Sequence, residues 1–287
     1  MTVWAVTGGT GLVGRFIVED LLAAGEEVVV LSRTRLPDPP FSRPVEVRPV
    51  VLDRAAEADV TGVDRLVHCA FDHVAGRYRG GEGADPDGFR RRNVGGSLAL
   101  FEAARAAGAA AAVFLSSRAV YGGYPPGTLL AEDMAPRPDT LYGEAKLAVE
   151  EGLAALAGPG FAAASIRATG VFGAGPGQKW QALLADHLAR RPVAPRVATE
   201  LHGADLAAAV RLVAGRTGVW NASDLVLDRR DLLAEANAVL GRDLPLPERA
   251  DSVQVSAMDC TRLRALGWQP RGGDRLRRDL PEMLAAL

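Results

Sequence analysis

A tyrosine and a lysine stand four residues apart in the segment LYGEAKLAVE, at Tyr142 and Lys146. On a helix this spacing places both side chains on one face. An ammonium group near a phenol stabilises the phenolate and lowers the pKa of the tyrosine, which can then exchange a proton with a substrate hydroxyl or carbonyl. The pair therefore predicts an acid/base site for chemistry at an alcohol or a ketone.

Lysine is rare in this chain, and its rarity bears on the role of Lys146. It occurs only at Lys146 and Lys179, and the other members of the Lys+Arg total of 33 are arginine. A compact ammonium can reach both a ribose and a phenol, a task to which the broad planar guanidinium is poorly suited. The alternative is a surface ion pair between Lys146 and Glu150, one helical turn further on. Because arginine supplies positive charge elsewhere, we favour the catalytic interpretation.

A glycine-rich turn follows the first predicted strand. The segment VTGGTGLVG leaves this strand and opens a helical pattern, with glycines at 8, 11 and 14. Such a turn lets a pyrophosphate approach the backbone, while the helix N-terminus offers free N–H groups and the positive end of its dipole. A plain strand-to-helix connection is the alternative. We expect a dinucleotide to contact Gly8, Gly11, Leu12, Val13 and Gly14.

The end of the second strand bears on the choice of dinucleotide. This strand ends at Ser32, and Arg33 follows it. An acidic residue here would bind a ribose 2′-hydroxyl, whereas a small residue beside a guanidinium suits a 2′-phosphate. The sequence therefore favours NADP over NAD, with a solvated loop arginine as the alternative. Asp53, at the end of the third strand, is placed either to accept a hydrogen bond from the adenine amino group or to cap a helix.

Ser117 ends the fifth predicted strand. Ligands of parallel α/β sheets bind at the carboxyl ends of the strands. A hydroxyl at this edge can hold a substrate oxygen opposite the tyrosine, although a serine at the end of a strand is usually a turn residue.

The elements that must position these groups alternate along the first half of the chain. Continuously apolar segments predict strands, and helical patterns separate them, so we expect an α/β fold with a Rossmann-type, doubly wound parallel sheet. Strands are predicted at Val3–Thr7, Glu27–Ser32, Val45–Leu52, Arg65–Ala70, Ala111–Ser117 and Phe161–Arg167, and helices at Leu12–Ala24, Asn93–Ala107 and Leu141–Ala157.

The pattern changes beyond Arg167, where glycine-rich and proline-rich turns separate predicted helices. These helices are expected at Trp180–Arg191, Ala204–Ala214 and Asp228–Leu240. We therefore predict a dinucleotide-binding Rossmann domain over residues 1–168 and a smaller, mainly helical substrate-binding lobe over residues 169–287, part of which returns to the Rossmann sheet.

Composition excludes several classes of function. The formal net charge is −2, and the arginines are interleaved with acids, so neither nucleic acid nor a membrane surface is an expected partner. The run at 90–92 is expected to be a solvated helix start. Cys69 and Cys260 are far apart and form no metal-spaced motif. With no signal peptide and no apolar run that could span a bilayer, we expect a cytoplasmic chain that binds a small molecule and allows a homodimer.

Several motifs occur in an order that resembles the extended short-chain dehydrogenase/reductase family, which contains nucleotide-sugar epimerases and dehydratases. They are TGGTGLVG, HCA, NVGG, LSSRAVYGG and YGEAK, continued by RATGVFGAGPG, LHGADLAAAV, GVWNASD and LRALGWQP. The resemblance implies that Tyr142 is the acid/base, that Lys146 binds the nicotinamide ribose and tunes Tyr142, and that Ser117 orients the reacting oxygen. It also implies that Asn93 supports the helix around the site and that Ala70 lines the cofactor.

Some positions depart from the family pattern. Dehydratases have an acidic pair just after the serine position, where this chain has Arg118 and Ala119, so dehydration is not expected. Members that hold a nucleotide diphosphate usually have an asparagine at the position of Gly170 and an arginine at that of Ala198. Arg196 lies two residues out of register. These departures weaken the expectation of a nucleotide-sugar substrate.

The sequence therefore predicts an NAD(P)-dependent oxidoreductase or epimerase that moves hydride at a secondary alcohol or ketone of a sugar-like substrate. The alternative is a nucleotide-sugar 4-epimerase without net redox change. A non-catalytic dinucleotide-sensing protein is a third hypothesis, but it would be expected to have lost Tyr142 or Lys146, and both are present.

Overall fold

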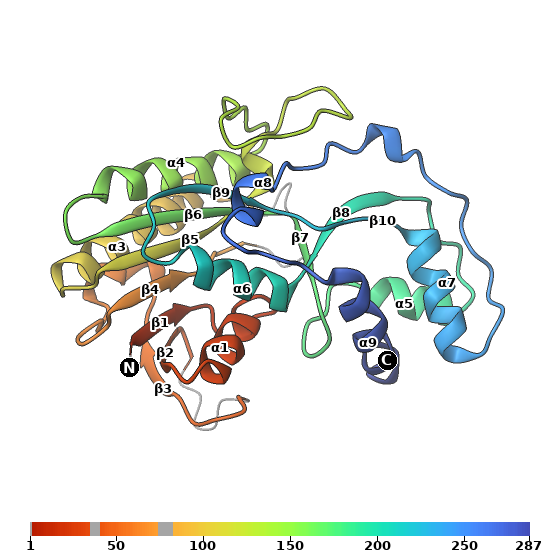
Figure 1. Ribbon diagram of the computed structural model, residues 1–287, viewed down its shortest axis with the longest axis horizontal. Coiled ribbons are helices and arrows are strands. Elements are labelled where there is room, and N and C mark those ends of the chain that lie inside the picture. The colour runs from red at the N-terminus through yellow and green to blue at the C-terminus, as the bar shows by residue number, and fades with distance from the viewer. Residues whose placement is uncertain (1, 35–40, 74–82) are drawn as a thin grey trace.

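The computed structural model describes residues 2–34, 41–73 and 83–287. A seven-stranded parallel sheet forms its centre, in the order β3-β2-β1-β4-β5-β6-β9 (Figure 1). The order runs outward from β1 in both directions, and in such doubly wound sheets the reversal point is where ligands bind. The strands are β1 (Val3–Thr7), β2 (Glu27–Ser32), β3 (Glu46–Pro49), β4 (Arg65–His68), β5 (Ala111–Ser117), β6 (Ala162–Ala168) and β9 (Gly218–Ala222). The predicted fold class is confirmed.

Helices cover both faces of this sheet. Alternate residues of a strand point to opposite faces, so neighbours in the sequence enter different cores. Val6 packs in the core that contains Ile17 of α1, whereas the adjacent Ala5 packs in the core that contains Leu100 of α3. The first core lies between the sheet and α1 (Gly14–Ala23) and α6 (Gly203–Val213), and the second between the sheet and α3 (Gly96–Ala106) and α4 (Leu141–Leu156).

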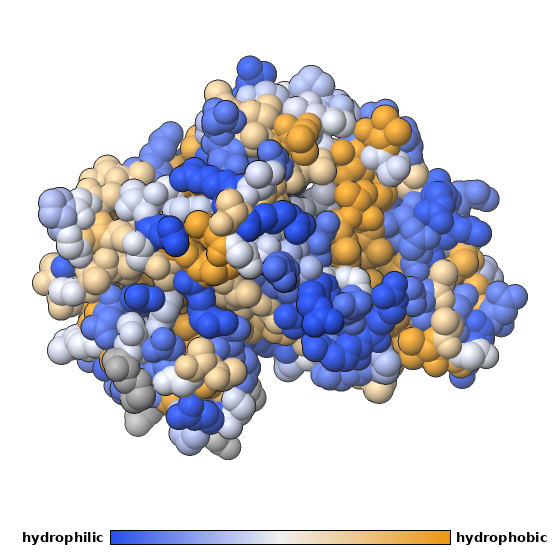
Figure 2. Space-filling model, in the orientation of Figure 1, coloured by the Kyte–Doolittle hydropathy of each residue, from blue (hydrophilic) through white to orange (hydrophobic). Residues whose placement is uncertain are grey.

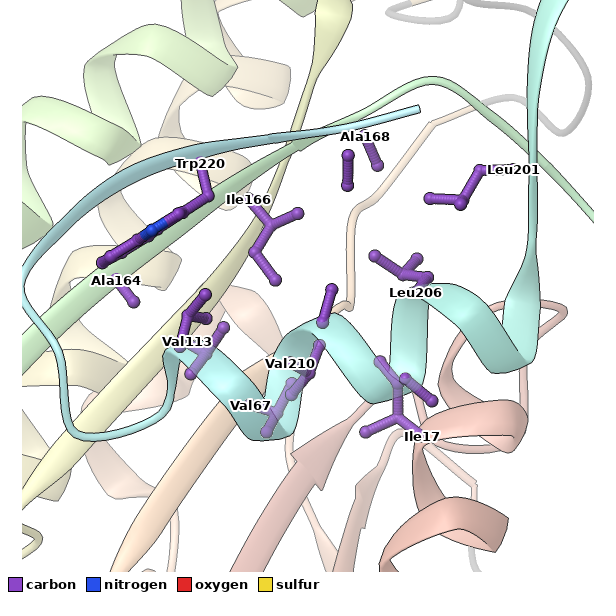
Figure 3. Packing of buried hydrophobic residues seen from close by; sticks show 14 of the residues in the cluster. Ile17, Val67, Val113, Ala164, Ile166, Ala168, Leu201, Leu206, Val210 and Trp220 are labelled. Carbon is purple, nitrogen blue, oxygen red and sulfur yellow. The ribbon is translucent and has the colours of Figure 1, made fainter. Parts of the chain in front are cut away.

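The first core is closed by elements from the C-terminal half of the chain. In Figure 3, Val210 of α6 lies next to Val67 on the sheet, Leu206 lies toward Leu201, and Trp220 of β9 is at one end of the cluster. Both α6 and β9 follow residue 168, so the later part of the chain completes the large sheet and one of its layers.

A smaller lobe is built on a second sheet in the order β10-β8-β7. Its core includes Phe172 and Trp180, whose rings stack at 4.8 Å between centroids. On the face drawn in Figure 2, apolar surface gathers over the region of β8 and β10, beside hydrophilic surface over α9. The strands are β7 (Gly170–Phe172), β8 (Val197–His202) and β10 (Leu225–Asp228), and the helices are α5 (Gln181–Leu188), α7 (Arg229–Leu240), α8 (Thr261–Arg264) and α9 (Gly272–Ala285).

The helix predicted at Asn93–Ala107 begins earlier and is not uniform. The side chain of Asp85 caps α2 (Pro86–Arg90) by accepting a hydrogen bond from the N–H of Gly88 at 2.8 Å. A π-helical turn, η2 (Arg91–Gly95), then leads into α3. Such a turn shifts the helical register, and it places Asn93 inside the protein. Within the described residues, the 3₁₀ turns are η1 (Leu52–Glu57), η3 (Arg118–Val120) and η4 (Ser252–Gln254).

The proline-rich segment LPDPPFSRP (residues 36–44) lies partly outside the described residues, which resume at Phe41. In the part of the chain that the structure describes, no helix has the length and apolar character needed to cross a membrane.

Candidate active site

The glycine turn after β1 is closely packed. Gly8 has a φ of +65°, and a Cβ there would lie 3.0 Å from the amide nitrogen of Ala70. A Cβ on Gly14 would overlap the carbonyl oxygen of Gly8, which accepts a hydrogen bond from the N–H of Gly11 at 3.0 Å. Val13 caps α1 without a side-chain hydrogen bond, and the first turn of the helix contains no acidic residue. The positive end of α1 is therefore uncompensated, as a pyrophosphate-binding turn requires.

A hydrogen-bonded chain fixes the loop after β4, where Ala70 faces Gly8. The Thr7 hydroxyl oxygen accepts from the N–H groups of Cys69 at 3.1 Å and Ala70 at 3.0 Å. Its own proton is then free to go to Nδ1 of the buried His68, 2.7 Å away. Nε2 of His68 consequently carries the proton and donates to Ser97 Oγ at 2.8 Å. Burial, reinforced by the charge of Lys146, lowers the pKa of His68 to about 3, so the imidazole is neutral.

Asn93 holds the continuation of the same loop. Its Oδ1 accepts from the N–H of Asp72 at 2.7 Å, and its Nδ2 donates to the carbonyl oxygens of Asp72 at 2.8 Å and Phe89 at 3.0 Å. The π-helical turn directs this amide inward. The Asn93 side chain thus joins the helix to the loop after β4, and its role at the site stays a prediction.

The residues expected to select NADP are Ser32 and Arg33, and the structure places a carboxylate close to Arg33. Ser32 ends β2, but the guanidinium of Arg33 lies 3.7 Å from the carboxylate of Asp72, and its side chain is 75% exposed. A neighbouring carboxylate competes with a 2′-phosphate for the same cation. Asp53 lies in the first turn of η1, 3.6 Å from Nε of Arg91. The structure therefore gives no support to a preference for NADP.

The predicted catalytic residues lie on β5 and α4, two elements that are in contact. Ser117 ends β5, and its Oγ accepts from the N–H of Ala119 at 3.1 Å. Thr140 caps α4 by accepting from the N–H of Gly143 at 3.1 Å. A Cβ on Gly143 would lie 2.6 Å from the carbonyl oxygen of Ala119, so glycine lets the first turn of α4 pack against η3. This packing brings Tyr142 to the edge of the sheet that carries Ser117.

Lys146 is buried beside Tyr142. Its Nζ donates to the carbonyl oxygen of Leu115 at 2.7 Å and lies 5.7 Å from the centroid of the Tyr142 ring. The rings of Phe71 and Phe114 flank it at 4.1 and 4.7 Å. Burial lowers the pKa of Lys146 to about 7, although the anionic forms of nearby groups act in the opposite direction. A lysine with this pKa gains and loses its charge near neutral pH, which is the range in which a proton-transfer site works.

The second lysine contributes to a separate pocket in the C-terminal lobe. Nζ of Lys179 lies 2.5 Å from the carboxylate of Glu200, and a Cβ on Gly170 would lie 2.5 Å from the same nitrogen. The glycine that stands where an asparagine was expected therefore makes room for the lysine. Burial raises the pKa of Glu200, and Lys179 opposes that effect.

This pocket has a volume of about 350 Å³ and a basic wall, formed by Lys179, Arg196 and Arg229. Among the described residues, neither arginine forms an ion pair. Nη1 of Arg229 donates to the carbonyl oxygen of Ala194 at 3.0 Å, and burial and the charge of Arg196 both lower the pKa of Arg229. Sequence reasoning missed Arg229 because its position in the wall depends on the pairing of β10 with β8. It singled out Lys179 for its rarity, but assigned it no role.

The comparison with protein families agrees with this architecture. The model of the NAD dependent epimerase/dehydratase family matches residues 4–213, more than two thirds of the 287-residue chain. The chain belongs to the NAD dependent epimerase/dehydratase family. The resemblance indicated by the motifs is confirmed, and the tight turn at Gly8 and Gly14 fits the nicotinamide dinucleotide that gives the family its name.

Individual members of the family differ in chemistry. A UDP-glucose 4-epimerase of Streptomyces lividans is 34% identical over 154 residues, which are 51% of this chain and 45% of that relative. A ceramide reductase of Caulobacter vibrioides is 42% identical over 107 residues, 37% of this chain and 32% of the reductase. The chain therefore spans half or less of the length of these two curated relatives. A structure of the Thermus thermophilus UDP-glucose 4-epimerase in complex with NAD is 27% identical, with a TM-score of 0.79 and 100% of both chains covered.

Proposed function

We propose that this chain is an NAD-dependent epimerase that acts on a nucleotide-diphosphate sugar. One observation carries the proposal. Arg196 and Arg229 line the same pocket and neither forms an ion pair among the described residues, although Glu200 lies within electrostatic reach of Arg196, and the charge of Arg196 lowers the pKa of Arg229. A diphosphate would supply the missing negative charge. The departures at Gly170 and Ala198 weakened the expectation of a nucleotide-sugar substrate. Lys179, Arg196 and Arg229 nevertheless line the pocket, so we propose that these residues bind the diphosphate instead.

The topology supports a substrate that joins this pocket to the catalytic residues. Ala168 of β6 is the register partner of Ser117 on β5. Two residues further on, Gly170 of β7 is the partner of Glu200, which lines the pocket. A nucleotide diphosphate bound at the basic wall would thus extend its sugar toward Ser117.

The proposed roles at the sugar follow from the chemistry of each group. NAD, when bound at the glycine turn, supplies reversible two-electron oxidation of the substrate carbon. Tyr142 takes the proton from the substrate hydroxyl as the ketone forms and returns it after the sugar has offered its other face. Ser117 holds the reacting oxygen by a hydrogen bond. Lys146, when charged, stabilises the phenolate of Tyr142 and so keeps the proton transfer balanced near neutral pH.

The choice of NAD is part of the proposal. The match to an NAD-dependent family supports it, and so does the carboxylate of Asp72 beside Arg33, which disfavours a second phosphate at that position. The solved Thermus thermophilus relative contains NAD.

The test is calorimetric titration of UDP into the NAD-loaded protein. We expect micromolar binding that weakens at least tenfold in Arg229→Ala and in Arg196→Ala, because each substitution removes charge-assisted hydrogen bonds to phosphate. Arg216→Ala is the matched control, since Arg216 is exposed, lies outside the pocket lining and donates to the carbonyl oxygen of Leu212. Absence of UDP binding in the unsubstituted protein would overturn the nucleotide-diphosphate assignment.

Product analysis then separates epimerisation from net redox chemistry. Net redox chemistry is the second candidate because the chain is also similar to a ceramide reductase. With UDP-sugars as substrates, an epimerase yields an epimer while the absorbance of NADH at the end of the reaction is unchanged. Stoichiometric gain or loss of NADH would instead establish a dehydrogenase or reductase.

A further inference from the structure

Arg118 joins the catalytic edge of the sheet to the C-terminal part of the chain. It follows Ser117 directly and begins η3. Its Nε and Nη2 both donate to the carbonyl oxygen of Ser256, at 3.2 and 3.0 Å, across a sequence separation of 138 residues. The side chain is therefore fixed in direction, and its backbone directly follows Ser117 at the proposed site of chemistry.

The charge of Arg118 has no counterpart among the described residues. No carboxylate of that part of the chain forms an ion pair with it, and burial lowers its pKa without an acidic group to oppose the effect. Arg167, the other arginine buried near β5 and β6, binds the carboxylate of Glu150 at 2.8 Å. Docking on the carbonyl oxygen of Ser256 requires only a neutral donor. A half-buried guanidinium without an anion is costly, which makes a ligand anion its expected partner.

The position of Arg118 limits where that anion can be on the substrate. The basic wall of the pocket accounts for the diphosphate at one end, whereas Arg118 stands beside Ser117, at the end where the sugar reacts. Nη1 of Arg118 donates no hydrogen bond within the described residues and can serve a ligand. In a hexuronic acid the carboxylate is attached to C5, next to the C4 carbon. A carboxylate there reaches a guanidinium beside the group that holds the C4 oxygen.

We propose that Arg118 binds a sugar carboxylate and that the substrate is a nucleotide-diphosphate uronic acid. The inference rests on the proposed function and adds the substrate class to it. It also gives a reason for the arginine at a position where dehydratases of the family have an acid. The acidic pair of a dehydratase would repel the carboxylate of a uronic acid substrate, whereas Arg118 would stabilise it.

The test compares UDP-glucuronic acid with UDP-glucose as substrates for the NAD-loaded protein. We expect the unsubstituted protein to favour UDP-glucuronic acid in kcat/KM. Arg118→Gln should lower the ratio of kcat/KM for the two substrates by about a hundredfold, because a neutral amide still donates to Ser256 but does not pair with the carboxylate. Arg118→Lys should keep part of the ratio. Arg137→Gln is the matched control, an exposed arginine stacked on Tyr124 in the loop that follows η3.

The outcomes separate this inference from the proposed function. Equal losses for both substrates in Arg118→Gln would mean that Arg118 only docks the segment at Ser256, and the inference would be wrong. Conversion of UDP-glucose but not of UDP-glucuronic acid by the unsubstituted protein would also overturn it, with the epimerase proposal intact. Failure to bind UDP at all would remove both. Titration of each variant with UDP, whose binding does not involve Arg118, shows whether the variant is folded.

Discussion

Glu150 follows Lys146 by one turn of α4, yet its carboxylate binds Arg167 on β6. Nη2 and Nε of Arg167 lie 2.8 and 3.1 Å from the two carboxylate oxygens, and the side chains are only 5% and 4% exposed. Ser116 donates a further hydrogen bond to Glu150. The surface ion pair considered as an alternative for Lys146 is therefore wrong, because Lys146 is buried and Glu150 serves another cation.

The pair of Glu150 and Arg167 gives a prediction about stability. In Glu150→Gln the buried guanidinium loses its counter-charge, and we expect the free energy of unfolding to fall by about 3 to 5 kcal/mol. Denaturant unfolding monitored by circular dichroism measures this change. Glu151→Gln, at the exposed neighbouring position, should shift it by less than about 0.5 kcal/mol. Similar small effects from both substitutions would contradict the prediction.

Lys146→Arg should damage catalysis although it conserves charge. The ammonium sits between Phe71 and Phe114 and points at a single carbonyl oxygen, and a guanidinium is too broad for that space. We expect kcat to fall by about a hundredfold or more, with a comparable loss in Tyr142→Phe, because each removes part of one proton-transfer unit. Steady-state kinetics on the accepted UDP-sugar provides the measurement. Near-normal turnover in Lys146→Arg would show that shape at this position is unimportant.

NAD should bind at least as tightly as NADP. Arg33 is largely exposed and close to Asp72, so it offers a 2′-phosphate little net attraction. Fluorescence titration with NADH and NADPH measures both affinities, and Arg33→Ala should change neither by more than a few-fold. A tenfold preference for NADPH that disappears in Arg33→Ala would restore the cofactor choice expected from the sequence.

In the folded protein, His68 should remain neutral, with its proton on Nε2, even at pH values well below the ordinary pKa of histidine. Because burial lowers its pKa in the folded state to about 3, only the unfolded chain takes up a proton between pH 6.5 and that value. His68 thus contributes stability that is present above pH 6.5 and is progressively lost as the pH falls toward 3, by up to a few kcal/mol. Long-range nitrogen NMR of the ring identifies the tautomer. Protonation of His68 in the folded protein near pH 6 would contradict the assignment.

The parts of the fold that the sequence predicts well are those whose residues are buried on both sides. β1, β2 and β5 have the predicted bounds, because continuous apolar runs are what a central parallel strand requires. β8 escaped prediction because it mixes Thr199 and Glu200, which serve polar contacts, with apolar Leu201. The amphipathic α9 is arginine-rich on its exposed side and also went unrecognised.

The residues of the candidate site also differ in how far they could be predicted from the sequence. Local spacing is enough to propose Tyr142, Lys146 and the glycine turn as site residues, since each proposal depends on neighbours close in the sequence, and these assignments stay predictions. The basic wall of the pocket and the charge of Arg118, which has no ion-pair partner in the described part of the chain, depend on contacts between segments far apart in the sequence. No sequence window contains that information.

The position of β9 has a consequence for how the chain is made. Until Gly218–Ala222 has been synthesised, β6 is an open edge with unsatisfied N–H and C=O groups, and the face later covered by α6 exposes apolar side chains to water. The dinucleotide-binding half cannot reach its final form while it is the only part outside the ribosome. A nascent chain stalled before β9 is therefore exposed to pairing with other strands, which is the kind of intermediate that chaperones protect.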